Sequence, residues 1–385
     1  MRIAGIISEY NPFHNGHAAQ LSMVRKECDG VVTVMSGSFV QRGDVAVYDK
    51  WTRAHAALLS GADLVLELPC CYALATAERF AYGAVSLLDQ TGVIDRLYFG
   101  AETPDTDAFQ KAGTLLCCEP PEVSEKLQKA LSFGLSFPAA RQKAFAGWIP
   151  EELLSLPNNL LGLEYCRALF AQKSRIEPHA LPRIGADHHQ MDASGEIASA
   201  TQIRSLLKSR EDASAYLPNN ALPLYQKSEQ RSLALIERML LYRLRTAKPA
   251  ALLDLADVSE GLENRILSAA KNACSYSELL QAIETKRYPA ARIRRILLSF
   301  LLGIPGSMQK EPIPYLRILG MNQQGREILR KIKKHSTLSI ITKAADYSPN
   351  EMFLADCRAT DLASLCQKTI QKSRADYLTP PVILD

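Results

Sequence analysis

Cysteine pairs of the metal-binding or redox type are missing from the sequence. No two of its nine cysteines have the two-residue separation of a CxxC motif. A zinc ribbon and a thioredoxin-like redox centre are therefore excluded, and no metal site is predicted. An odd number of scattered cysteines is typical of a protein in a reducing compartment, so we expect a cytoplasmic location.

Long apolar runs are missing as well. No stretch approaches the roughly 18 apolar residues that a membrane-spanning helix requires. The apolar run near the N-terminus is too short for a secretory signal and lacks a cleavage site made of small residues. The sequence therefore predicts neither a signal peptide nor a membrane partner.

A strong net charge is also absent. The formal net charge of the 385 residues is +4, so any attraction to nucleic acid has to come from local clusters of cations. The length corresponds to two or three domains. A hydrophobic content of 47% is ordinary for a globular protein and is enough to build a sizeable core.

The first half of the chain alternates strand and helix patterns. Short, continuous apolar strands that alternate with helices predict a parallel sheet covered on both faces, as in Rossmann-like α/β proteins. The predicted strands are residues 2–8, 30–36, 63–68 and 95–99, and the predicted helices are residues 16–24, 49–60 and 76–90.

The second half has a different pattern. Residues 209–230 are polar and contain two prolines and two asparagines, which is typical of a linker or domain edge. Apolar residues at helical spacing follow, and one predicted helix begins after Pro289 and stops at Gly303. We therefore expect a Rossmann-like adenylation domain over residues 1–210 and a mainly helical domain over residues 211–385.

An HxGH motif, residues 14–17, lies at the turn from the first strand into the first helix. This is the carboxyl edge of the predicted sheet, where ligands bind, and a helix N-terminus there attracts phosphate. Gly16 leaves room for a nucleotide. His14 and His17 are able to donate hydrogen bonds to phosphoryl oxygens and to stabilise developing charge. The alternative is two surface histidines in a polar turn, but the position after a strand favours nucleotide binding.

The segment SATQIR, residues 199–204, opens another predicted helix. It is similar to the ISSTxIR signature that accompanies HxGH in nucleotidyltransferases. Ser199 and Thr201 are suited to cap the helix and bind phosphate, and Arg204 is suited to reach the outer phosphates. The alternative is an ordinary helix cap with a solvated arginine.

Several long motifs together resemble the bacterial tRNA(Met) cytidine acetate ligase family, over nearly the whole chain. They are EYNPFHNGH, MSGSFVQRGDVAVYDKWTRAHAALLSGADLVLELP, YFGAE, PNNLLGLEY, RIGA, SATQIRSLL, TKRYPAARIRRILL and YLRILGMNQQGREIL. The resemblance implies a nucleotidyltransferase fold of the HIGH type. It also implies that acetate and ATP give acetyl-adenylate, which then acetylates N4 of the wobble cytidine in elongator tRNA(Met). ATP and Mg²⁺ are the implied cofactors.

The resemblance also implies which residues contact ATP. Besides Ser199, Thr201 and Arg204, they are Ile7, Ser8, Glu9, Tyr10, Asn11, Pro12, Phe13, His14, Asn15, Gly16, His17, Gln20, Gly100, Asn158, Asn159 and Arg183. Without the family, Gly100 would be interpreted as a turn glycine, Asn158 or Asn159 as a helix cap, and Arg183 as a surface charge.

Lys50 is a further catalytic candidate beside His14 and His17. It follows the second strand and a loop, and a lysine there is long enough to reach a phosphate or the carboxylate of the substrate. Many lysines at helix starts are merely exposed, so both interpretations stay open. Ser36, Gly37 and Arg42 line the same loop.

Two local features depart from the family pattern. Asp187, His188 and His189 replace the usual Tyr-His-Asp stretch, and Ala200 replaces a hydroxyl residue of ISSTxIR. A DHH sequence also occurs in metal-dependent phosphoesterases, but those enzymes have further acidic clusters that this sequence lacks. A metal site is therefore not predicted there.

Five cations surround Pro289 and suit a phosphate backbone: Lys286, Arg287, Arg292, Arg294 and Arg295. The apolar residues of the following helix predict that Arg292 and Arg295 share its solvent face. The alternative is an ordinary solvated helix face. A second run of cations lies at residues 331–335.

Two other functions remain open on sequence grounds. A small-molecule adenylyltransferase of the HxGH type would share the chemistry without needing a basic helical half. A non-catalytic tRNA-binding protein on a decayed scaffold is the other alternative, although the intact His14, Gly16, His17 and Arg204 argue against decay.

Overall fold

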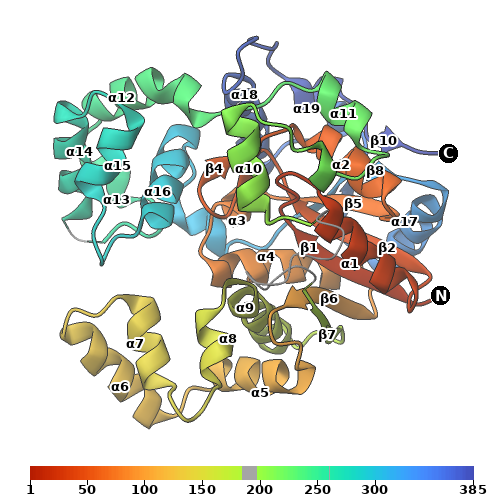
Figure 1. Cartoon of the computed structure of the whole chain (residues 1–385), viewed down its shortest axis with the longest axis horizontal. Helices are drawn as coiled ribbons and strands as arrows, with labels where there is room; N and C mark the ends of the chain where they lie inside the picture. Colours follow the sequence, from red (N-terminus) through yellow and green to blue (C-terminus); the bar gives the residue numbers. More distant parts are fainter. Residues whose placement is uncertain (184–196, 260) are drawn as a thin grey trace.

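A mixed sheet of eight strands forms the centre of the computed structural model, which describes residues 1–183, 197–259 and 261–385 (Figure 1). The strand order is β10-β8-β5-β2-β1-β6-β7, and β9 also pairs with β8. The strands are β1 (Ile3–Ser8), β2 (Gly30–Ser36), β5 (Leu64–Leu68), β6 (Arg96–Ala101), β7 (Glu177–Pro182), β8 (Tyr315–Met321), β9 (Ser339–Ile341) and β10 (Val382–Ile383). A separate hairpin consists of β3 (Phe39–Val40) and β4 (Asp44–Val45).

The four strands predicted in the first half are confirmed, and they pair in parallel. Ile3 of β1 lies opposite Gly30 of β2, and β1 also pairs in parallel with β6. Among the described strands, the one antiparallel pairing in this eight-stranded sheet is between β5 and β8, where Leu64 lies opposite Met321. Parallel order brings the carboxyl ends of β1, β2 and β6 to one edge, where ligand sites form.

Helices cover both faces of the sheet because alternate strand residues point to opposite sides. In β1, Ile3 and Ile7 join one core cluster, whereas Ala4 and Ile6 join the other. The first face carries α3 (Cys70–Ala73), α4 (Ala77–Gln90), α5 (Thr106–Cys117), α9 (Pro157–Ala171), α17 (Gln323–His335) and α18 (Glu351–Ser364). The second face carries α1 (Asn15–Arg25), α2 (Lys50–Leu59), α10 (Ala200–Ser209) and α11 (Leu222–Lys227).

Two groups of helices extend from this centre (Figure 1). One consists of α6 (Pro121–Ser132), α7 (Phe137–Ala144) and α8 (Glu151–Ser155). The other, here called the helical body, has a core of its own. It consists of α12 (Glu237–Arg245), α13 (Ala250–Leu253), α14 (Leu262–Asn272), α15 (Tyr276–Ile283) and α16 (Ala290–Leu302). As predicted, α16 follows Pro289 and ends at Gly303, whose positive φ of 62° suits a glycine.

The chain returns to the sheet after the helical body. All seven residues of β8 are buried, and α17 and α18 pack on the same core as α4 and α9. The expected boundary at residue 210 therefore does not separate sheet from helices. An apolar strand such as YLRILGM can bury both its faces only inside a covered sheet.

The interpretation of residues 209–230 as a linker is wrong. The segment forms η1 (Ser214–Tyr216) and α11, and it buries Ala213, Leu217, Ala221 and Tyr225 in the second core cluster. The Tyr225 hydroxyl donates to the carbonyl oxygen of Phe13 (3.0 Å). The remaining short elements are η2 (Leu233–Ile236), η3 (Gly306–Lys310), η4 (Ala344–Asp346) and α19 (Ala375–Leu378). Among the helices of the described residues, none has the length and apolar character needed to cross a bilayer.

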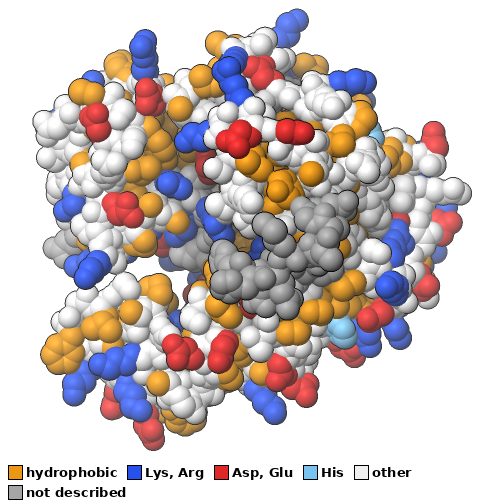
Figure 2. All heavy atoms as spheres, viewed as in Figure 1, with side chains coloured by type: hydrophobic (Ala, Val, Ile, Leu, Met, Phe, Trp, Pro, Cys, Tyr) orange, Lys and Arg blue, Asp and Glu red, His pale blue; other side chains and the backbone are white. Residues whose placement is uncertain are grey.

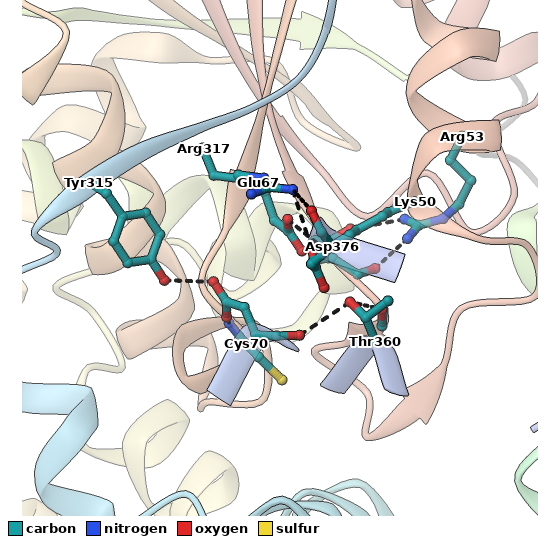
Figure 3. A network of polar contacts seen from close by, with 12 residues as sticks. Lys50, Arg53, Glu67, Cys70, Tyr315, Arg317, Thr360 and Asp376 are labelled. Atoms are coloured by element: carbon teal, nitrogen blue, oxygen red, sulfur yellow. Dashed lines mark hydrogen bonds and ion pairs between the residues drawn. The ribbon is translucent and has the colours of Figure 1, made fainter. Parts of the chain in front are cut away.

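A buried ionic network ties the C-terminal segment to the sheet (Figure 3). Lys50 Nζ donates to both carboxylate oxygens of Glu67 (2.7 and 2.8 Å) and to Asp376 Oδ1 (2.7 Å). Arg317 Nη2 donates to the carbonyl oxygen of Asp376 (3.0 Å). Burial alone would lower the pKa of Lys50, but Asp376 and Glu67 outweigh it and raise that pKa. The network thus joins α2, β5, β8 and α19.

Replacing Lys50 by methionine should lower the free energy of unfolding by about 3–5 kcal/mol, because the buried Glu67 carboxylate loses its cation and Asp376 keeps only Arg317 (3.4 Å). The measurement is urea denaturation followed by circular dichroism. The matched control is Lys343→Met, since Lys343 pairs with Asp346 (3.1 Å) on the surface and such pairs contribute little. Equal midpoints for the two variants would contradict this interpretation of the network.

Candidate active site

The two histidines of the HxGH motif organise the start of α1. His14 is the N-cap residue, and its Nδ1 accepts a hydrogen bond from the backbone N–H of Gly16 (3.1 Å). His17 Nδ1 accepts from the backbone N–H of His14 (3.3 Å). Because each Nδ1 is an acceptor, each imidazole carries its proton on Nε2. The two rings stack with their centroids 3.8 Å apart, so a pair of Nε2–H donors stands at a helix N-terminus.

Both histidines are neutral at physiological pH. Burial, followed by the nearby charges of Arg183 and Arg204, lowers the pKa of His14 to about 3. Burial, followed by the neighbouring His14 and Arg183, holds the pKa of His17 well below its ordinary value. Each ring is therefore uncharged and presents one Nε2–H donor.

The loop between β1 and α1 is fixed from several sides. Tyr10 is fully buried and has a positive φ of 46°. Asn11 Oδ1 accepts from the backbone N–H of Val47 (2.9 Å), and the Asn11 carbonyl accepts from Arg204 Nη1 (2.7 Å). These bonds hold the loop in one conformation before any ligand binds, which lowers the entropic cost of positioning a substrate.

The SATQIR residues lie beside this loop. Ser199 caps α10 by accepting from the backbone N–H of Gln202 (3.1 Å). Arg204 Nη2 donates to the hydroxyl of Thr201 (3.1 Å) while its Nη1 holds the HxGH loop. Two segments about 185 residues apart in sequence are thus brought to one edge of the sheet, as the paired motifs predict.

Gly100 lies near the carboxyl end of β6, beside β1 in the sheet. A Cβ atom built on this residue would have no neighbouring atom within 4 Å. The backbone is therefore open to a ligand at this position, which fits a flat base or ribose lying against it.

The asparagine pair at the start of α9 has a positioning role that the sequence prediction missed. Glu102 accepts hydrogen bonds from Asn158 Nδ2 (2.6 Å) and from the backbone N–H of Asn159 (2.9 Å). Asn159 is fully buried. Its Oδ1 accepts hydrogen bonds from the backbone N–H groups of Glu102 and Thr103, and its Nδ2 donates to the carbonyl oxygen of Glu152. The predicted contact of the Asn159 side chain with ATP is therefore corrected: its polar atoms are already used. The sequence did contain a signal for this role: Glu102, the partner of both asparagines, is the last residue of the YFGAE motif.

Comparison with known proteins agrees with this geometry. The profile of the family described as HIGH Nucleotidyl Transferase matches residues 1–377. The tRNA(Met) cytidine acetate ligases of Clostridium kluyveri and Caldanaerobacter subterraneus are 41% and 40% identical, with full coverage of both chains. The crystal structure of Thermotoga maritima TmcAL bound with alpha-thio ATP is 32% identical and fully covered, with a TM-score of 0.91. The chain belongs to the HIGH nucleotidyl transferase family.

Membership in the HIGH nucleotidyl transferase family confirms the resemblance drawn from the motifs and the predicted fold class. The residues assigned to the site are not all supported by their positions. Lys50 is 0% exposed and is held by Glu67 and Asp376, so its ammonium group does not reach a substrate. We correct its predicted catalytic role to a structural one, since a paired buried cation is stable only with its partners.

The loop that contains Ser36, Gly37 and Arg42 depends on a residue that the sequence prediction overlooked. Arg53 of α2 is 0% exposed and donates to the carbonyl oxygens of Ser36 and Gly37. It also donates to the carbonyls of Glu9 (2.8 Å) and Tyr48 (3.0 Å). No sequence signal identified it, because an arginine in an amphipathic helix is usually exposed.

The predicted RNA-binding cations do not form one surface. Arg295 is 9% exposed, and it pairs with Asp257 and donates to the carbonyl of Gln41. Arg292 donates to the carbonyl of Asp257 (2.6 Å). Their predicted placement on a shared solvent face is wrong, because α16 packs its basic side against the β3–β4 hairpin and the 254–257 turn. Lys286 and Arg287 are exposed, and Arg294 is half-buried.

Asp187, His188 and His189 lie outside the described residues. Across residues 1–183, 197–259 and 261–385, no group of three His, Cys, Asp or Glu side chains is arranged to hold a metal ion. The nine cysteines are present as free thiols.

The buried His14 makes the free energy of unfolding depend on pH. In the unfolded chain, His14 binds a proton below about pH 6.5, whereas in the folded chain its pKa is about 3. The unfolded state therefore binds more protons between these values, and stability falls as pH decreases through this window. His14→Gln should reduce that fall by up to about 1.4 kcal/mol per pH unit.

The measurement is urea unfolding of both proteins at several pH values between 7 and 4. A matched control is His335→Gln, since His335 lies outside the HxGH loop and is exposed at the end of α17. Identical pH slopes for wild type and the His14 variant would rule out a buried neutral His14.

Proposed function

We propose that the protein uses ATP to activate acetate and then transfers the acetyl group to N4 of the wobble cytidine of elongator tRNA(Met), giving N4-acetylcytidine. The observation that carries the proposal is the neutral His14–His17 pair at a helix N-terminus, in a chain 41% identical over its full length to a tRNA(Met) cytidine acetate ligase. ATP and tRNA are cytoplasmic substrates, so we place the reaction in the cytoplasm.

The first half-reaction is displacement at phosphorus. An acetate oxygen attacks the α-phosphorus of ATP, the bond to the bridging oxygen breaks, and pyrophosphate leaves. We propose that the Nε2–H groups of His14 and His17 donate to the phosphate oxygens where charge builds up, and that the N-terminus of α1 adds a favourable dipole. Arg204 and the open backbone at Gly100 complete the ATP site that we propose.

We propose that Mg²⁺ enters with ATP. The described residues offer no cluster of acidic or histidine ligands for it. Mg²⁺ commonly keeps several waters and binds through substrate phosphates, so a dedicated protein cage is not needed. Its contribution would be to neutralise phosphate charge.

The proposed tRNA contact lies on the helical body. Figure 2 shows Lys and Arg side chains between the helical body, at the upper left, and the centre of the molecule. Lys286 and Arg287 are exposed in the loop between α15 and α16, and the Arg287 guanidinium lies over the Tyr288 ring (5.6 Å to the ring centroid). Cations on an exposed edge suit the phosphate backbone.

A small-molecule adenylyltransferase remains the alternative from another class of function. Both functions would use the HxGH site, but only the tRNA ligase needs acetate and the exposed cations of the helical body. The two are separated by the carboxylic acid that supports pyrophosphate exchange and by tRNA binding.

Acetate should support exchange of pyrophosphate into ATP without any RNA. His14→Ala and His17→Ala should each lower the exchange rate by roughly 10²–10³, if each behaves as one oxyanion-hole donor. The assay follows labelled pyrophosphate with a panel of carboxylic acids. Unchanged exchange in the double alanine variant would remove the histidines from catalysis.

Binding of tRNA should weaken with salt, because phosphate contacts release counterions. Changing Lys286 and Arg287 together to alanine should reduce the slope of log K against log[salt] by about 1–2 units. The matched control removes Lys331 and Lys334, which are exposed on α17 at the opposite side of the molecule (Figure 1). Equal slopes for the two double variants would place the RNA elsewhere.

A further inference from the structure

The two half-reactions differ in their proton balance. Attack of an acetate oxygen on phosphorus releases pyrophosphate and requires no proton transfer from the nucleophile. In the second step the N4 amino group attacks the carbonyl carbon, the bond from that carbon to the AMP oxygen breaks, and AMP leaves with the electron pair. N4 must also lose a proton, so the second step gains from a positioned base.

The histidines of the HxGH motif and Lys50 are the first candidates for that base, but each is already engaged in other contacts. The Nδ1 lone pairs of His14 and His17 accept backbone N–H groups, and their Nε2 atoms carry protons. Neither imidazole therefore has a free nitrogen lone pair that could accept a proton from a substrate. Lys50 is enclosed by two carboxylates. Within residues 1–183, 197–259 and 261–385, the candidate base is therefore another group near the HxGH loop.

Glu9 is the first residue after β1 and is held rigidly. Its carbonyl oxygen accepts from Arg53 Nη1 (2.8 Å), which fixes the backbone. Its side-chain Oε1 accepts from the backbone N–H of Gln41 (2.8 Å), and in the described part of the chain the carboxylate forms no ion pair. The side chain is half-buried, so it remains accessible at the edge of the sheet.

Glu9 is also linked, through Gln41, to the helical body that we propose binds tRNA. Gln41 belongs to the β3–β4 hairpin, and its carbonyl accepts from Arg295 Nη1 (3.4 Å) of α16. A Cβ atom on Gly43 would lie 2.5 Å from Arg294 Cβ, so the hairpin and α16 are in direct contact. Glu9 therefore lies where the HxGH loop meets the segment that packs on the helical body.

We propose that Glu9 is the catalytic residue that accepts the N4 proton of cytidine during acetyl transfer. The inference rests on the proposed function. As N4 bonds to the acetyl carbon, its proton moves to a carboxylate oxygen of Glu9 while AMP departs with the electron pair. The acetylated base is left neutral, and Glu9 later releases the proton to water.

The surroundings of Glu9 are suited to this task. Burial, the largest influence, raises the pKa of the Glu9 carboxyl above its ordinary value, although the bond from Gln41 and the charges of Arg42, Arg204 and Arg53 act against it. The charge of Glu9 in turn adds to burial in raising the pKa of the Tyr165 phenol on α9. A raised pKa makes the carboxylate a stronger base at neutral pH.

The test begins with acetyl-adenylate supplied directly, so that the transfer step is measured without ATP. Single-turnover transfer to tRNA is followed across pH at saturating acetyl-adenylate. Glu9→Gln keeps an oxygen that accepts from Gln41 but removes the basic carboxylate. We expect the transfer rate to fall by roughly 10²–10⁴ and its acidic limb to disappear. Glu9→Asp should keep that limb at a reduced rate.

The matched control is Asp44→Asn, on the same hairpin and half-buried, which should transfer at nearly the wild-type rate. A normal rate in Glu9→Gln, or a slow rate with the wild-type acidic limb, would overturn the proposal. Failure of the proposed function is distinguishable, because the wild type itself would then show neither acetate-dependent exchange nor transfer.

Discussion

The arrangement of the site depends on one buried guanidinium. Backbone carbonyls emerge from the ends of β1 and β2 into a space closed to water, and unpaired buried carbonyls are costly. Arg53 satisfies those of Glu9, Ser36 and Gly37, together with the carbonyl of Tyr48 before α2, from a single side chain. A lysine could not replace Arg53, because only the planar guanidinium group directs several N–H donors at fixed angles. The HxGH loop begins from the backbone that this residue holds.

A second buried cation lies one turn earlier on α2. Lys50 joins Glu67 of β5 to Asp376 of α19, so a residue near the C-terminus supplies a counter-charge at the centre of the sheet. Such a network is worth little as net stability, but it strongly penalises any arrangement that separates the partners. The helix that carries both cations thereby aligns β1, β2, β5 and the C-terminal segment.

The chemical character of the histidines also comes from their backbone contacts. An isolated HxGH sequence does not say which nitrogen is protonated. The N–H groups of Gly16 and His14 occupy the Nδ1 atoms, and burial keeps both rings neutral. This combination leaves each ring with an Nε2–H donor, which suits a phosphate, and with no free nitrogen lone pair for the proton of the cytidine amine. The two half-reactions of the proposed function thus place different demands on one loop.

The sequence by itself determined the alternation of strands and helices, the limits of α16 and the motifs that place the chain in its family. These are local properties: apolar periodicity, Pro289 and Gly303 as helix boundaries, and residue identities at short spacing. Only the tertiary structure decided that Lys50 and Arg295 are buried, that Asn159 serves Glu102, and that residues 213–225 pack in the core. Each of these depends on partners tens to hundreds of residues away, such as Asp376 for Lys50. No local pattern encodes such a pairing, because it arises when distant segments are brought together around the sheet.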